Sequence, residues 1–306
     1  MSLSLVHLGG AKVPRSGVEY PLVMRDDDLP SLRAVTGIML ALVGYALIVP
    51  LVAQGVIRIG YLFRGGEFDV YRSAARGYEY PEGLLASHLA LATLIPIALL
   101  LARYINGYQP RWVASVQPGL RGRYLLISAL VALVVLNAVL WLGLIVRDEV
   151  PAFHSGQDGW GWFLLAIVVG APLQAAAEEV FFRGYLLQAL GAASGNKWVA
   201  LVASSLLFAL FHGVQNPALF AHRLAFGLVA GGLVLAVGGL EAGIAAHVVN
   251  NLGAYGYAMF TGSIADLRVV SEITWEKAGW DIAGFALFAG AAWWVGRRLR
   301  VATATP

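Results

Sequence analysis

The stretch YLLISALVALVVLNAVLWLGLIV (124–146) runs for 23 residues without a charged side chain. A helix needs about 20 mostly apolar residues to cross a bilayer core of about 30 Å. The stretch therefore predicts a transmembrane helix and makes the chain a membrane protein.

Further apolar runs flank this stretch on both sides. They are found at 34–57, 84–104, 160–189, 197–213, 217–239, 241–262 and 280–296. We therefore predict an all-α fold, a polytopic bundle of about eight transmembrane helices. A cytoplasmic N-terminal segment (1–33) would precede a single transmembrane domain (34–300).

The composition agrees with a chain that is solvated mainly by lipid. Of its 306 residues, 59% are hydrophobic and 13% are charged, whereas soluble domains carry about 25% charged residues. So many apolar residues also exclude a disordered chain. There is no cysteine, which excludes disulfides, thiolate metal sites and cysteine nucleophiles. The N-terminus lacks the pattern of a cleavable signal peptide, so we expect the first apolar helix to direct insertion.

The basic residues predict the orientation of the bundle, because cytoplasmic loops are enriched in Lys and Arg. The loop 103–123 contains four arginines and no acidic residue. After eight spans, the C-terminal cluster Arg297, Arg298 and Arg300 falls on the same side. We expect both termini in the cytoplasm and the protein in the plasma (inner) membrane.

Three charged residues lie inside the predicted span 160–189: Glu178, Glu179 and Arg183. Charged groups at membrane depth cost at least about 2.5–3.5 kcal/mol each and are candidates for function. Glu179 and Arg183 are four residues apart, so they share a helix face and can form an ion pair. Glu178 points about 100° away. It is left free to face a cavity and to act as a general base.

Histidines in the neighbouring spans add to this set. Phe208 and His212 share one face of the span 197–213, and His247 and Asn251 share one face of the span 241–262. One group could take a proton from water while others stabilise an oxyanion, which are the parts of a hydrolytic site. The span 217–239 has His222 and Arg223 close to its start and continues with Gly227 and Gly231, small residues that permit close helix packing.

Packing roles are the alternative for each residue alone. We interpret Glu179–Arg183 as a structural pair and His222 as a packing residue. The joint occurrence of Glu178, His212, His247 and Asn251 on neighbouring helices favours a site over isolated packing roles.

The motifs EExxxR (Glu178, Glu179, Arg183), FxxxH (Phe208, His212) and HxxxN (His247, Asn251) occur in this order on separate predicted helices. Together they resemble the CAAX protease and bacteriocin-processing family, the intramembrane type II CAAX prenyl endopeptidases and Abi-like proteins. The resemblance covers about 178–251 and implies a protease core at about 160–262.

The resemblance implies a role for each matching residue. Glu178 would activate water with help from His212, and His247 and Asn251 would form the oxyanion hole. Glu179 and Arg183 would support the site, and Phe208 would line its chamber. No cofactor is firmly implied. A zinc ion held by Glu178, His212 and His247 would have the three ligands of a catalytic site, but another base would then be needed, so we favour direct activation of water.

Counting along upright, full-length helices raises a conflict. Glu178 lies 11 residues, about 16 Å, from the end of 160–189, whereas His212 falls near the far end of 197–213, roughly 22 Å from its start. Tilted, broken or offset helices around a water-filled cavity would remove the conflict.

The leading hypothesis is a membrane-embedded endopeptidase that acts on a lipidated C-terminus, a leader peptide or a small membrane peptide. Its partners would be membrane lipid and a peptide or lipidated protein, with no nucleic acid. One alternative is a non-proteolytic scaffold or immunity protein of the same fold. A proton-coupled transporter is less favoured, because the sequence lacks the internal repeats of many transporters.

Overall fold

The computed structural model describes residues 10–25, 30–213 and 215–306. Part of the predicted N-terminal segment 1–33 therefore lies outside the described residues. The described part is helical and contains three isolated β-bridges instead of a sheet.

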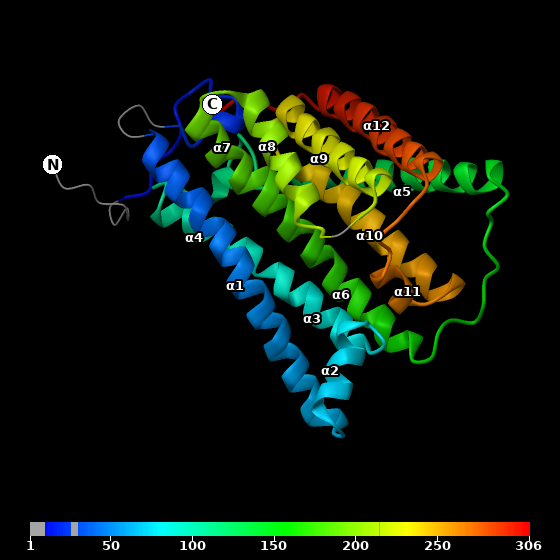
Figure 1. The fold of residues 1–306 in the computed structure, drawn as a ribbon. Coiled ribbons are helices and arrows are strands. Elements are labelled where there is room, and N and C mark those ends of the chain that lie inside the picture. Colours follow the sequence, from blue (N-terminus) through cyan, green and yellow to red (C-terminus); the bar gives the residue numbers. More distant parts are fainter. Residues whose placement is uncertain (1–9, 26–29, 214) are drawn as a thin grey trace.

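Figure 1 shows the helices in chain order. They are η1 (Tyr20–Leu22), α1 (Pro30–Arg64), α2 (Phe68–Arg76), α3 (Pro81–Ala92), α4 (Leu94–Tyr104), η2 (Pro110–Val113), α5 (Gly122–Val146), α6 (Trp160–Glu178), η3 (Glu179–Leu186), α7 (Leu187–Ser194), α8 (Lys197–Leu210), α9 (Pro217–Val237), α10 (Glu241–Thr261), α11 (Ile264–Arg268) and α12 (Trp275–Arg298).

The all-α membrane fold is confirmed, and each of the eight predicted spans coincides with helix. Five helical stretches are long and apolar enough to cross a membrane: Leu32–Arg64, Pro81–Tyr104, Gly122–Val146, Trp160–Ser194 and Pro217–Val237. A sixth apolar helix, Lys197–Leu210, is shorter. A bundle of eight membrane crossings remains a prediction.

The predicted span 84–104 is divided at Thr93 into α3 and α4. Pro96 lies one turn later, and a proline cannot donate the backbone hydrogen bond that would continue the helix through Ala92. The short helices α2 and α11 were not predicted, because each has too few residues for a membrane span.

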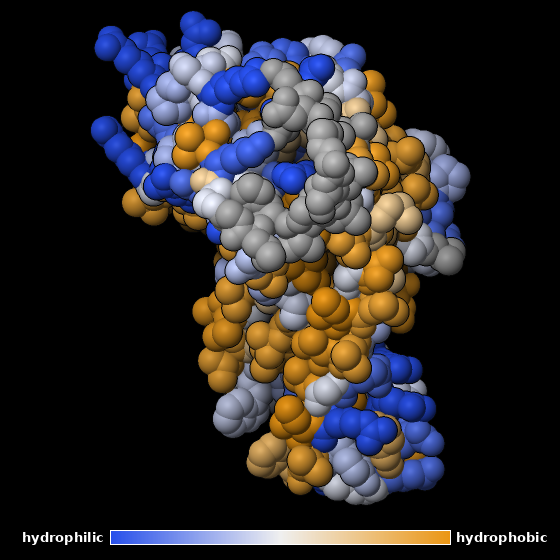
Figure 2. Space-filling view, turned by 90° about the vertical axis from the view of Figure 1, so that its left-hand side faces the viewer, coloured by the Kyte–Doolittle hydropathy of each residue, from blue (hydrophilic) through white to orange (hydrophobic). Residues whose placement is uncertain are grey.

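The rod formed by α6, η3 and α7 occupies the centre of the bundle. It packs against α1, α3, α4, α8 and α10, while α5, α9, α10 and α12 pack together on its other side. Figure 2 shows the side of the molecule that lies at the left in Figure 1. On this side, a hydrophobic band lies between two more hydrophilic ends. Leu47 and Leu51 of α1 are strongly exposed, as expected for side chains that face lipid.

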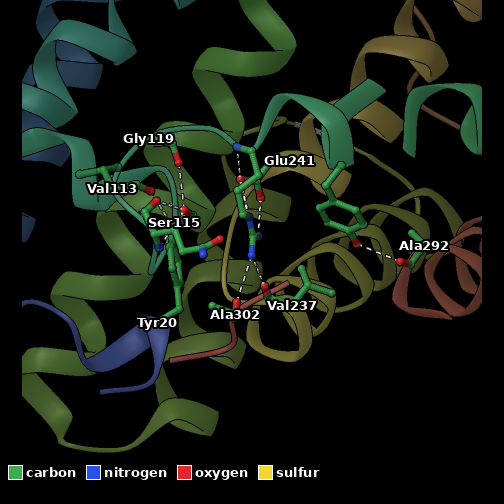
Figure 3. Close-up of polar contacts among 11 residues, drawn as sticks. Tyr20, Val113, Ser115, Gly119, Val237, Glu241, Ala292 and Ala302 are labelled. Carbon is green, nitrogen blue, oxygen red and sulfur yellow. Dashed lines mark hydrogen bonds and ion pairs between the residues drawn. The ribbon is translucent and has the colours of Figure 1, made fainter. Parts of the chain in front are cut away.

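A buried ion pair ties several segments together at the predicted cytoplasmic end (Figure 3). Arg121 donates from Nε and Nη2 to the Glu241 carboxylate at 2.8 and 2.6 Å, and its backbone N–H donates to Oε1 at 2.8 Å. Its Nη1 reaches the carbonyls of Val237 and Ala302 at 2.9 and 3.0 Å. Glu241 is fully buried at the first residue of α10, where the helix dipole favours a negative charge. Arg121 is therefore a structural link as well as a basic loop residue.

We expect the substitution Glu241→Ala to lower the free energy of unfolding by about 3–5 kcal/mol, because it leaves Arg121 buried without its partner. Denaturation in mixed detergent micelles measures the change. The control is Asp69→Ala, which breaks an exposed pair with Arg72 and should cost about 0–1 kcal/mol. If both substitutions lower the free energy of unfolding by the same small amount, the Arg121–Glu241 pair does not stabilise the fold as proposed.

Candidate active site

Two adjacent carboxylates meet one histidine where α6 becomes η3. Glu178 is the last residue of α6, and Glu179 is the first residue of η3, a π-helix. Short π-helical turns within α-helices are frequent at functional sites. The carboxylates diverge, as their angular separation predicted, yet both contact the ring of His247 on α10.

Glu178 is 6% exposed and makes two different contacts. Its Oε1 accepts a hydrogen bond of 2.7 Å from Gln174 Nε2, one turn earlier on α6. Its Oε2 lies 3.5 Å from His247 Nε2 and has no hydrogen-bond partner among the described residues. The carboxylate is therefore less isolated than expected, with one oxygen held by Gln174 and the other buried without a hydrogen-bond donor among the described residues.

Glu179 forms the ion pair that its spacing predicted. Its Oε1 lies 3.1 Å from Arg183 Nη1, and both side chains are buried. The guanidinium lies 3.9 Å from the ring centre of Phe208 and 5.2 Å from that of Phe226, where cation–π attraction contributes. A Cβ at Gly243 would come within 2.9 Å of Glu179 Oε2. The missing side chain at this position of α10 thus makes room for the carboxylate.

His247 lies between the two carboxylates. Its Nδ1 is 2.9 Å from Glu179 Oε1, and its ring packs against Phe226 at 5.1 Å between centroids. A carboxylate accepts hydrogen bonds only, so Nδ1 must carry the proton of this bond. Glu179 therefore orients the ring and directs Nε2 toward Glu178.

Asn251 lies one turn after His247 on α10 and faces α6. Its Nδ2 donates to Gln174 Oε1 at 2.7 Å, and its Oδ1 accepts from Asn250 Nδ2 at 3.2 Å. Gln174 and Asn250 are outside the set of site residues predicted from the sequence. Gln174 precedes Glu178 by four residues, so the i, i+4 rule that paired Glu179 with Arg183 could have found it.

His212 lies two residues beyond the end of α8. Its Nδ1 is 2.7 Å from the Phe208 carbonyl oxygen, and the two rings are 4.5 Å apart. His222 lies 5.6 Å from Phe285 between ring centres, and its packing role remains a prediction. Its Nε2 lies 3.6 Å from an Asp281 oxygen.

A cavity of about 540 Å³ opens beside these residues, within the range typical of ligand sites. Its polar wall includes His212, His222, Arg223, His247, Asn250 and Asn251, and Phe208 lines the cavity beside them. Its apolar wall includes Leu136, Val139, Leu140, Trp280 and Phe285 from α5 and α12. Glu178 is not among the described residues that line the cavity, but its neighbour His247 is.

The longer central rod removes the depth conflict. Helix continues to Ser194, instead of residue 189, and α8 starts at Lys197. Glu178 is therefore 16 residues before the turn and His212 is 15 residues after the start of α8, so at 1.5 Å per residue both lie at a similar depth, roughly 22–24 Å. α10 begins at the buried Glu241, so its first turns also start inside the protein.

The zinc set Glu178, His212 and His247 does not fit this arrangement as a three-ligand site. Within the described part of the chain, no three His, Cys, Asp or Glu side chains are grouped closely enough to hold a metal ion. His212 Nδ1 contacts a backbone carbonyl, which leaves Nε2 as the nitrogen that could bind a metal. Zinc binding remains a prediction.

Residues 160–253 match the model of the Rce1-like family, type II CAAX prenyl endopeptidases. The resemblance predicted from the three motifs is thereby confirmed over this range, which includes every candidate site residue from Glu178 to Asn251. Protein YyaK of Bacillus subtilis (strain 168) is 28% identical over 227 residues, which are 69% of this chain and 75% of that protein. The matched segment is thus similar to a family of membrane peptidases.

Proposed function

We propose that this protein is an intramembrane endopeptidase with its catalytic core at 160–262. The observation that carries the proposal is the contact of Glu178 with His247 and, through Gln174, with Asn251, beside a cavity. The family match over the same residues supports it.

In the proposed mechanism, Glu178 is the general base. A water molecule next to its unpaired Oε2 loses a proton to the carboxylate as the water oxygen attacks the scissile carbonyl carbon. The protonated Glu178 then transfers this proton to the leaving amine as the carbon–nitrogen bond breaks. His212, on the cavity wall, assists in positioning the water.

His247 and Asn251 are the proposed donors to the oxyanion. The bond from Nδ1 to Glu179 fixes the orientation of the ring, and Nε2 is the atom proposed to donate to the oxyanion. Asn251 Nδ2 carries a second hydrogen beyond the one given to Gln174, and this hydrogen is available for the oxyanion.

The proposed substrate is a peptide or lipidated protein that enters from the membrane. The apolar wall formed by α5 and α12 suits an aliphatic or lipidated segment, while the polar wall holds the peptide bond. We further propose a single transmembrane domain over 34–300 of about eight crossings, with both termini in the cytoplasm and the protein in the plasma (inner) membrane.

We expect purified protein in lipid nanodiscs to cleave peptides whose C-terminal cysteine motif is prenylated faster than the same peptides without the lipid. Cleavage is measured by mass spectrometry, with a bacteriocin-type leader peptide as a third substrate. Parallel reactions with a chelator, and metal analysis of the protein, test zinc: loss of activity that zinc alone restores would favour a metal-dependent site. Folded protein that cleaves none of these peptides would instead favour a scaffold or immunity role.

A further inference from the structure

Three side-chain amides form a continuous hydrogen-bonded chain that ends at Glu178. Asn250 Nδ2 donates to Asn251 Oδ1, Asn251 Nδ2 donates to Gln174 Oε1, and Gln174 Nε2 donates to Glu178 Oε1. The last two bonds are each 2.7 Å long. All the donors point toward the carboxylate, and hydrogen bonds aligned in this way strengthen one another.

The carboxylate determines the direction of the whole chain. An ionised glutamate has no proton to donate, so the Gln174 amide must turn its nitrogen toward Glu178. The Gln174 side-chain oxygen then faces α10 and needs a hydrogen-bond donor. The Asn251 amide must therefore turn its nitrogen toward Gln174. A reversed Asn251 would place two carbonyl oxygens against each other in a buried site.

Gln174 is 7% exposed and connects α6 with α10 at the level of the site. It is outside the three sequence motifs and does not line the cavity among the described residues. It therefore reaches a substrate only through the two residues that it contacts.

We infer that Gln174 is a positioning residue that sets the orientation of the general base Glu178 and of the oxyanion donor Asn251 together. This inference rests on the proposed function. The single amide of Gln174 holds both the general base Glu178, which takes the proton, and the donor Asn251, which stabilises the oxyanion. Loss of the amide would leave both side chains in place but free to rotate.

The test substitution is Gln174→Met, which keeps the length of the side chain and removes both hydrogen bonds. We expect kcat to fall about 10- to 100-fold, as when a catalytic group is misplaced by about 1 Å, with KM changed by less than about threefold because substrate binding groups are untouched. Gln174→Met should have a weaker effect in a protein that already carries Asn251→Ala, because one of the two groups that Gln174 orients is then missing. The fold-decrease in kcat should be at least about five times smaller there than in the parent protein.

Gln188→Met is the matched control. Gln188 is also buried in the central rod, but it donates to the Trp112 carbonyl oxygen, away from the site. We expect it to reduce thermal stability as Gln174→Met does while kcat stays within about threefold of the parent protein.

The outcomes separate the inference from the function on which it rests. If Glu178→Gln abolishes cleavage and Gln174→Met leaves kcat unchanged, only the positioning role is overturned. The same follows if Gln174→Met lowers kcat by equal factors with and without Asn251, or if Gln188→Met lowers kcat as strongly. If the folded parent protein cleaves no peptide, the proposed function itself fails and the inference falls with it.

Discussion

Replacing Glu178 by glutamine is expected to lower kcat by about 10²–10⁴-fold, the contribution typical of a positioned acid–base group. Glutamine has nearly the same shape and still accepts the Gln174 hydrogen bond through its oxygen, but it cannot take a proton from water. The assay is the peptide cleavage described above, at saturating substrate.

The same substitution is expected to leave stability unchanged or higher. Glu178 Oε2 is buried without a hydrogen-bond partner among the described residues, and replacing the carboxylate with a neutral amide lowers the cost of desolvating this group. The control is Glu149→Gln, which makes the same substitution at an exposed glutamate and should retain activity. Full activity of Glu178→Gln would eliminate Glu178 as the base, and loss of the folded state together with activity would assign it a structural role.

Replacing Arg183 by methionine should have the largest effect on stability. The guanidinium is the cation paired with the fully buried Glu179, and removing one member of a buried pair typically costs about 3–5 kcal/mol. The stacking on Phe208 is lost as well. Denaturation in mixed detergent micelles measures the cost.

The double variant Glu179→Gln with Arg183→Met provides the control. It removes both charges, so it should be more stable than Arg183→Met alone, although the Nδ1 bond of His247 then ends on a neutral amide oxygen instead of a carboxylate and activity should not return. If the double variant is less stable than the single one, the cost does not come from an uncompensated carboxylate.

The helices could be predicted well from the sequence. A helix that crosses the bilayer needs about 20 apolar residues, so the length of each apolar run indicates where a helix lies. The prediction placed the end of the central rod near residue 189, because the segment GAASGN (191–196) consists of small residues and resembles a loop. The structure continues the helix to Ser194 by packing α7 against α1 and α8, and this tertiary contact has no local signal.

Within the site, spacing along one helix was informative and relations between helices were not. The Glu179–Arg183 pair follows from the i, i+4 rule, and Gln174–Glu178 obeys the same rule but was overlooked for lack of a charge. The contact between Glu179 and His247 depends on how closely α10 approaches η3, which Gly243 permits. The apolar wall of the cavity comes from α5 and α12, which carry no motif.

The π-helical turn of η3 has a consequence for how this segment can change in evolution. It accommodates more residues per turn than an α-helix, so deleting one residue between Glu179 and Leu186 would allow regular α-helical bonding. The π-turn takes up the extra residue, so the helix after it would keep its direction and Gln188 would keep its bond to Trp112. The change would fall on the side chains inside the turn, among them Arg183, whose pairing with Glu179 depends on their separation along this segment. A relative that is one residue shorter here should therefore keep the packing of α7 and lose the geometry of this ion pair.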